Sequence, residues 1–171
     1  ADWASLPWAA IPALQGLRAA DLKPGDRVLI NGAAGAVGSA ALQLARAQGY
    51  RSVAVARGHH GDRLRALGAD QLIDYSKASY LDTDEPYDAI FDLVGQHRPQ
   101  DNLRVIRPEG VYVAASGSTG DWWGPVGWML GAMWAGRAKR PRVALLNAVT
   151  TRAENGRAKS KERIFIKDVD I

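Results

Sequence analysis

The chain runs Val28-Leu29-Ile30-Asn31-Gly32-Ala33-Ala34-Gly35-Ala36-Val37-Gly38 and then continues with helical periodicity to Gln48. A β-branched apolar run, a turn of small residues and a helix in direct succession are typical of a dinucleotide-binding α/β unit. Glycine permits the sharp turn, and small side chains leave room for an anion at the first N–H groups of the helix. This stretch therefore predicts a pyrophosphate-binding turn, and the alternative is a tight strand-to-helix turn that holds no ligand.

Apolar β-patterned segments alternate with helical ones on both sides of this turn. The expected strands are Arg27–Asn31, Ser52–Ala56, Gln71–Asp74, Tyr87–Val94 and Val111–Ala115, with Val143–Leu146 as a sixth candidate. The expected helices are Ala13–Ala20, Val37–Gln48, Asp62–Leu67 and Gln100–Ile106, and a turn is expected at Pro108–Gly110. This alternation predicts a doubly wound parallel sheet in three αβα layers, the Rossmann fold. We expect this domain to occupy residues 1–150, followed by a basic tail over residues 151–171 that ends in a further candidate strand.

Composition limits the chemistry that the chain can perform. The 171 residues are 47% hydrophobic, which is enough for one domain with a substantial core. The chain has no cysteine, so disulfides, thiolate zinc sites and a cysteine nucleophile are excluded, and we expect a cytoplasmic protein. The longest apolar run, Val126–Ala135, is too short to cross a bilayer, so no membrane association is expected. No Lys-Ser or Lys-Thr pair follows Gly38, which excludes a nucleoside-triphosphate P-loop.

The positive charge of the chain is concentrated near its end. Residues 1–136 contain 12 basic and 14 acidic residues, whereas residues 137–171 contain 10 basic and 4 acidic ones. A solvated basic end is the interpretation that we favour, and a surface for RNA or another polyanion is the alternative. Nucleic acid is therefore not the expected partner.

The residues after the second expected strand indicate which nucleotide binds. Enzymes that prefer NAD usually have an acid at this point, which accepts hydrogen bonds from the ribose 2′-hydroxyl. Here Arg57 follows the strand, and the first acid is Asp62. An arginine guanidinium matches the oxygens of a 2′-phosphate, and His60 and Arg63 are close in sequence. The sequence therefore predicts NADPH rather than NADH, and the alternative is that Arg57 is an exposed loop cation.

Several further segments resemble one family in the same order along the chain. They are Ser5–Pro7 with Ala13–Leu17, Leu22–Ile30, Gly32–Gly38, Leu67–Asp70 with Ile73–Tyr75, Tyr87–Gly95, and Ile106–Gly117. Together they resemble the coenzyme-binding domain of the medium-chain dehydrogenase/reductases, in the zinc-independent quinone oxidoreductase branch. The resemblance implies hydride transfer from NADPH to a small-molecule acceptor, a quinone or an activated C=C bond, with no metal. It also leaves a homodimer open.

The resemblance assigns cofactor-binding roles by position. They are Gly32, Ala34, Gly35, Ala36 and Val37 at the pyrophosphate, Arg57, His60 and Tyr75 around the 2′-phosphate, and Val94, Gly95, Ser116 and Gly117 toward the nicotinamide.

The chain departs from the family pattern in two respects. Pro12 stands where many relatives have a hydroxyl residue near the nicotinamide, so that polar contact is not expected here. The family's N-terminal catalytic domain, which supplies much of the substrate pocket, has no counterpart in these residues. No catalytic residue is therefore assigned, and the alternative function is a dinucleotide-binding sensor or scaffold without turnover. Asp92 is expected to be a strand-end residue near the cofactor.

Overall fold

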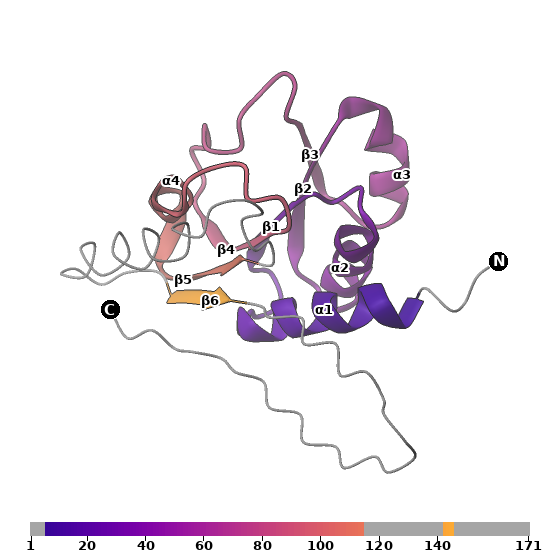
Figure 1. Ribbon diagram of the computed structural model, residues 1–171, viewed down its shortest axis with the longest axis horizontal. Helices are drawn as coiled ribbons and strands as arrows, with labels where there is room; N and C mark the ends of the chain where they lie inside the picture. Colours follow the sequence, from indigo (N-terminus) through magenta and orange to yellow (C-terminus); the bar gives the residue numbers. More distant parts are fainter. Residues whose placement is uncertain (1–5, 115–141, 146–171) are drawn as a thin grey trace, which may run out of the picture.

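The computed structural model describes residues 6–114 and 142–145, and these form a parallel sheet flanked by helices (Figure 1). The sheet has six strands in the order β3-β2-β1-β4-β5-β6, so the predicted Rossmann fold is confirmed. The strands are β1 (Arg27–Asn31), β2 (Arg51–Ala56), β3 (Gln71–Asp74), β4 (Tyr87–Asp92), β5 (Ile106–Ala114) and β6 (Arg142–Leu145). The helices are α1 (Leu6–Ala19), α2 (Ala36–Ala47), the 3₁₀ helix η2 (Gly58–His60), α3 (Gly61–Ala66) and α4 (Pro99–Arg104).

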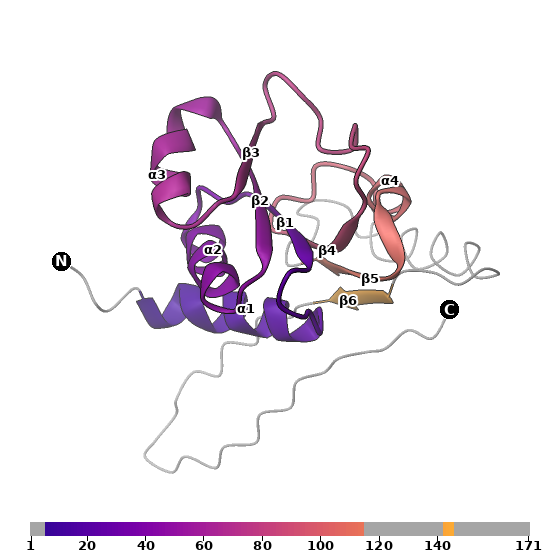
Figure 2. The ribbon, with the colours of Figure 1, turned by 180° about the vertical axis from the view of Figure 1, so that it is seen from behind.

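Helices cover both faces of the sheet, and the core is accordingly divided in two. α1 and α2 lie side by side on one face together with α3, and α4 lies on the other (Figures 1 and 2). Alternate residues of β1 serve the two faces: Val28 and Ile30 pack in the cluster that contains Leu42 of α2, whereas Leu29 packs with Ile90. Every residue of β1 is buried, as expected for the central strand of a parallel sheet.

The direction in which strands are added to the sheet reverses at β1. From β1 the chain adds β2 and β3 on one side, and it then crosses to add β4, β5 and β6 on the other side. In open α/β sheets, ligands bind in the crevice outside the carboxyl ends of the strands at such a reversal. Here the crevice is bordered by the residues that follow Asn31 in β1 and Asp92 in β4.

β5 begins earlier than the sequence predicts. It starts at Ile106 rather than Val111, and the segment Pro108–Gly110, predicted as a turn, lies inside the strand. The pairing with β4 is irregular at this point: Ile106 is buried, and the next three residues, Arg107, Pro108 and Glu109, are exposed. A Cβ at Gly110 would lie 2.6 Å from the carbonyl oxygen of Asp88. The turn-forming sequence therefore produces a bulge in which the two backbones approach closely, and the strand continues through it.

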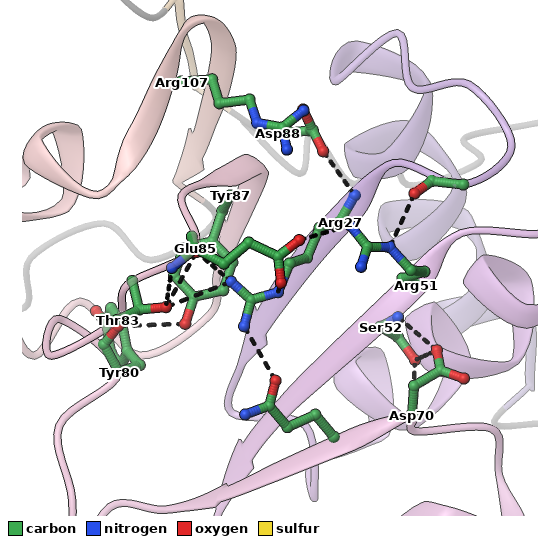
Figure 3. Close-up of polar contacts among 12 residues, drawn as sticks. Arg27, Arg51, Ser52, Asp70, Tyr80, Thr83, Glu85, Tyr87, Asp88 and Arg107 are labelled. Carbon is green, nitrogen blue, oxygen red and sulfur yellow. Dashed lines mark hydrogen bonds and ion pairs between the residues drawn. The ribbon is translucent and has the colours of Figure 1, made fainter.

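A cluster of polar side chains connects the amino ends of β1, β2 and β4 (Figure 3). Arg27 of β1 is only 5% exposed, and its guanidinium carbon lies 4.4 Å from the ring centroid of Tyr87. Its side chain donates to the carbonyl oxygen of Glu85 and pairs with the Glu85 carboxylate, Nε to Oε2, at 3.4 Å. Arg51 of β2 pairs with the other carboxylate oxygen at 2.7 Å, and Asp88 accepts from the backbone N–H of Arg27 at 2.7 Å. The charged groups described at this edge thus bind one another and link β1, β2 and β4.

Candidate functional site

The turn after β1 has a left-handed glycine at its first position. Gly32 has φ of +86°, and its N–H and that of Ala33 both donate to the carbonyl oxygen of Val55, at 3.3 and 3.2 Å. A Cβ at Gly32 would lie 2.9 Å from Cγ2 of Val94, beyond the end of β4. Glycine is therefore required here by conformation and by space, and the turn lies against both neighbouring strands.

α2 also approaches this turn closely, at Gly38. A Cβ at Gly38 would lie 2.4 Å from the carbonyl oxygen of Gly32 and 2.6 Å from Cα of Ala33. The Ser39 hydroxyl donates to the carbonyl oxygen of Ala33 at 3.3 Å, which joins the helix to the turn a second time. These contacts hold the amino end of α2 directly over the turn.

The amino end of α2 offers backbone donors to the crevice. Its N-cap residue, Gly35, provides no side-chain cap, and the Ser39 N–H donates to the Gly35 carbonyl oxygen at 2.9 Å as the first helical bond. The N–H groups before Ser39 lack helical partners, and the positive end of the helix dipole lies behind them. Gly35 and Ala36 are exposed. A dinucleotide pyrophosphate fits this arrangement because it accepts from such N–H groups without needing a side chain.

The end of β2 brings two of the predicted residues together. Parallel pairing sets Ala56 opposite Asp74, so Arg57 and Tyr75 follow at neighbouring strand ends. Nε of Arg57 donates to the Tyr75 hydroxyl at 2.8 Å, and the guanidinium carbon lies 5.8 Å from the ring centroid. Both side chains are exposed, and Nε is the one side-chain donor of Arg57 with a recorded partner among the described residues. Arg57 is therefore oriented by a specific partner, and its donors are available to a phosphate.

His60 follows in the same turn, within η2. Its backbone N–H donates to the carbonyl oxygen of Arg57 at 3.0 Å. Desolvation lowers the pKa of the half-buried His60 imidazole, and the positive charges of His59 and Arg63 lower it further. The imidazole is therefore neutral at pH 7. Arg63 extends from α3 to α2, where it donates to the Ser39 hydroxyl at 3.4 Å.

Asp74 supports this turn, a role that sequence reasoning missed. The carboxylate accepts from the N–H and the hydroxyl of Ser76, at 3.0 and 2.7 Å. Hydrogen bonds from the Ser76 hydroxyl, and secondly from its backbone, lower the pKa of Asp74. A Cβ at Gly58 would lie 2.5 Å from Oδ2 of Asp74, so the turn passes closely over the carboxylate. No local sequence pattern indicates this role of Asp74, because the role depends on the pairing of β2 with β3.

Asp92 occupies the end of β4, as predicted, and is fully buried. Its Oδ1 accepts from the Asn31 amide at 2.9 Å and from the N–H groups of Val94 and Gly95 at 3.0 and 2.9 Å. These two residues, predicted to form the end of the strand and the residue after it, instead form a turn in which Gly95 has φ of +70°. The strand stops at Asp92 because its own side chain takes the next backbone donors.

Most of the predicted site residues lie at the carboxyl ends of β1, β2, β3 and β4. Gly32 is near Val94, and Arg57 contacts Tyr75, whereas no hydrogen bond between those two pairs is recorded among the described residues. Pro12 lies half-buried in α1. Ser116 and Gly117 lie outside the described residues, as do most of the basic residues near the end of the chain.

Within residues 6–114 and 142–145, no three side chains of histidine, cysteine, aspartate or glutamate lie together as a metal would require. None of the helices in these ranges combines the length and apolar character needed to cross a membrane.

Comparison with known proteins gives matches over the same region. A family model described as zinc-binding dehydrogenase matches residues 36–121, half of the chain. The chain is 35% identical over 120 residues to a 2-methylene-furan-3-one reductase of Solanum lycopersicum, covering 69% of this chain and 30% of that protein. It is 36% identical over 121 residues to the chloroplastic NADPH-dependent alkenal/one oxidoreductase of Arabidopsis thaliana, covering 69% of this chain and 31% of that protein.

Solved structures agree with these matches. The quinone oxidoreductase of Coxiella burnetii superposes with a TM-score of 0.71 at 33% identity, covering 84% of this chain and 43% of that one. The chain thus spans about a third of the curated relatives and less than half of this structural neighbour. With the strand order and the glycine turn, these matches place the chain in the zinc-binding dehydrogenase family, within the quinone oxidoreductase-like branch of the medium-chain dehydrogenase/reductases.

Proposed function

We propose that this chain is the NADPH-binding part of a zinc-independent oxidoreductase that passes hydride to a quinone or an activated C=C bond. The observation that carries the choice of nucleotide is the Arg57–Tyr75 pair at the ends of β2 and β3. The matched Arabidopsis protein is named as an NADPH-dependent alkenal/one oxidoreductase, and the matched Coxiella structure is a quinone oxidoreductase. These names support the class of acceptor.

The chain's own residues would share the binding of the cofactor. The N–H groups at the start of α2 receive the pyrophosphate, beside the turn at Gly32. Arg57 would form charge-assisted hydrogen bonds with the 2′-phosphate, and Tyr75 would restrain the guanidinium through its hydroxyl, which accepts from Nε. When bound, NADPH supplies the hydride, and the protein orients the nicotinamide and excludes water. The turn at Val94 and Gly95 would border the nicotinamide half.

Zinc independence is supported by the ligands that the chain offers. It contains no cysteine, so a thiolate zinc site of the kind found in alcohol dehydrogenases has no ligands among these residues. The pyrophosphate turn and the Arg57 site consist of backbone donors, a guanidinium and a phenol, all of which suit anions rather than a cation.

The test compares the affinities of the 171-residue chain for NADPH and NADH by isothermal titration calorimetry. A charge-assisted hydrogen bond contributes about 1.5–3 kcal/mol, so Arg57→Ala should weaken NADPH binding about tenfold or more and leave NADH within about twofold. Arg65→Ala is the matched control, because it removes the same charge from an exposed position of α3 that pairs only with Asp62 among described residues. Equal affinities of the wild type for the two nucleotides would refute the proposal.

A second measurement separates a reductase from a binding module without turnover. The chain is given NADPH and a panel of quinones and enones, and NADPH oxidation is followed by its absorbance. Oxidation that depends on the acceptor and decreases in Arg57→Ala supports hydride transfer. Tight NADPH binding without oxidation by any acceptor would show that these residues bind the nucleotide without turnover, and the same assay on the longer protein that contains them then separates a reductase from a sensor or scaffold.

A further inference from the structure

A chain of buried hydrogen bonds runs behind the candidate site, from α4 through β5 to the end of β4. The Tyr80 hydroxyl donates to Oδ1 of Asn102 at 2.8 Å, and Nδ2 of Asn102 donates to the Tyr112 hydroxyl at 3.4 Å. Tyr112 in turn donates to Oδ2 of Asp92 at 2.8 Å. With Asn31, which donates to Oδ1 of Asp92, these residues form what we term the Asp92 network.

All members of the Asp92 network are buried, and the network is fully paired. Asp92 and Asn102 have no exposed surface, and Tyr80, Tyr112 and Asn31 have 3% or less. No buried side-chain nitrogen or oxygen in the described residues lacks a hydrogen-bond partner. Burial raises the pKa of Tyr112, and the nearby Asp92 raises it further, so the phenol remains a donor across the usual pH range.

Stability alone does not account for this arrangement. None of the ion pairs recorded among the described residues includes Asp92, so its buried carboxylate depends on hydrogen bonds alone. Removing an ionised carboxylate from water is costly, and well-packed apolar replacements of buried charged groups are often neutral or stabilising. What the carboxylate does provide is geometry, because one side chain fixes β1, β5 and the turn after β4 relative to one another.

The turn that Asp92 fixes borders the crevice. The N–H groups of Val94 and Gly95 both donate to Oδ1 of Asp92. The Val94 side chain is 51% exposed, and its Cγ2 would lie 2.9 Å from a Cβ at Gly32. A displacement of this turn therefore alters the crevice beside the pyrophosphate turn. It leaves Arg57 and Tyr75 untouched, because these follow β2 and β3 on the other side of β1.

We propose that the Asp92 network positions the Val94–Gly95 turn and thereby sets the affinity for the nicotinamide half of the dinucleotide. Asp92, Tyr112 and Asn102 are then positioning residues, which act through the turn without touching the cofactor. The inference rests on the proposed function, since it requires a dinucleotide in the crevice. It goes further by assigning the affinity for the 2′-phosphate half to residues that follow β2 and β3, and the affinity for the nicotinamide half to residues of β4 and β5.

Two ligands separate the halves of the site. NADPH occupies both halves, whereas adenosine 2′,5′-bisphosphate carries the adenosine half alone, with its 2′-phosphate and one phosphate of the pyrophosphate, and lacks the nicotinamide half. Tyr112→Phe removes one donor to Asp92 and keeps the ring. We expect it to weaken NADPH binding about tenfold, as the loss of a hydrogen bond to a charged group implies, and to change adenosine 2′,5′-bisphosphate binding by less than about twofold. Asp92→Asn should give the same selective loss, because an amide cannot accept all four hydrogen bonds as the carboxylate does.

The matched control is Tyr50→Phe. Tyr50 is also a buried tyrosine, but the acceptors of its hydroxyl are Oε1 of Gln48 at 2.5 Å and the carbonyl oxygen of Leu22 at 3.2 Å, both away from the Asp92 network. It should leave the affinities for both ligands unchanged. Circular dichroism and thermal melting of each variant establish the folded fraction, and if Asp92→Asn does not fold, Tyr112→Phe decides the question.

The outcomes are distinguishable. Selective loss of NADPH affinity in folded Tyr112→Phe supports the inference. Equal losses for the two ligands, or no loss for either, overturn the inference while leaving the proposed function in place. If the wild-type chain binds neither ligand, the proposed function fails and the inference fails with it.

Discussion

Gly38 is the position where the close packing of the turn can be tested with a single methyl group. A Cβ built there lies 2.4 Å from the Gly32 carbonyl oxygen and 2.6 Å from Cα of Ala33. Both of these atoms belong to the backbone, so no side-chain rotation relieves the contact. Bringing the oxygen to ordinary van der Waals distance, about 3.4 Å, requires α2 and the turn to separate by about 1 Å in Gly38→Ala.

The magnitude follows from the cost of overpacking. An inserted methyl group in a well-packed site costs about 1–3 kcal/mol, and the better helix propensity of alanine offsets up to about 1 kcal/mol of it. In a chain of this size, 1 kcal/mol lowers Tm by about 2–4 °C. Gly38→Ala should therefore lower Tm by several degrees. It should also weaken nucleotide binding, because the N–H groups of α2 move away from the turn at Gly32.

The assay combines thermal melting with NADPH titration, and Gly35→Ala is the matched control. Gly35 has φ of −73°, and a Cβ there would lie 3.4 Å from the Gly32 carbonyl oxygen, which is an ordinary contact. Because alanine is a poorer N-cap residue than glycine, the control should melt slightly below the wild-type temperature but above Gly38→Ala. If Gly38→Ala melts at the wild-type temperature, the argument from close approach is wrong.

Two further predictions concern pH. A hydrogen bond from Arg51 lowers the pKa of Glu85 below its ordinary 4.5, so its stabilising effect is complete above that value and is lost as the pH falls through the lowered pKa. Glu85→Gln should destabilise the chain at pH 7 and flatten the acid limb of its stability curve; identical limbs in urea denaturation would contradict this. Because the pKa of His60 is lowered from 6.5, protonation below pH 6.5 should add positive charge beside the 2′-phosphate. The NADPH affinity of wild type relative to His60→Gln should rise on acidification, whereas a constant ratio would exclude His60 from the site.

The central part of the fold was predictable from the sequence because its signals are local. β1 and β3 occur where predicted, and β2 begins one residue earlier, at Arg51. β1 and β2 are almost continuously apolar or small because parallel central strands are buried on both faces. β5 was misread because Pro108–Gly110 has the composition of a turn. Only the pairing of this segment with β4, which is distant in sequence, shows that the strand continues through it.

The candidate site, like the fold, was predictable where its features are local in sequence. The glycines of the turn and Arg57 follow directly from residue type and order, and the structure adds a contact between Arg57 and Tyr75. The buried hydrogen bonds that hold these residues in place were not predictable. Asp92 was expected at a strand end, but its donors come from β1, β5 and its own turn. Contacts of this kind depend on strand order and register, which no single segment encodes.

Asp74 lies beside the end of β2 but belongs to β3, and an acid in this place does not by itself indicate a preference for NADH. In enzymes that prefer NAD, the acid ends β2 and reaches the ribose hydroxyls. Asp74 ends β3 instead, its Oδ1 accepts from both donors of Ser76, and its Oδ2 lies beneath Gly58. The carboxylate is therefore occupied by the turn that carries Arg57. Asp74, at the end of β3, thus helps to build the loop of Arg57, which we propose binds the 2′-phosphate, whereas an acid at the end of β2 would favour NADH.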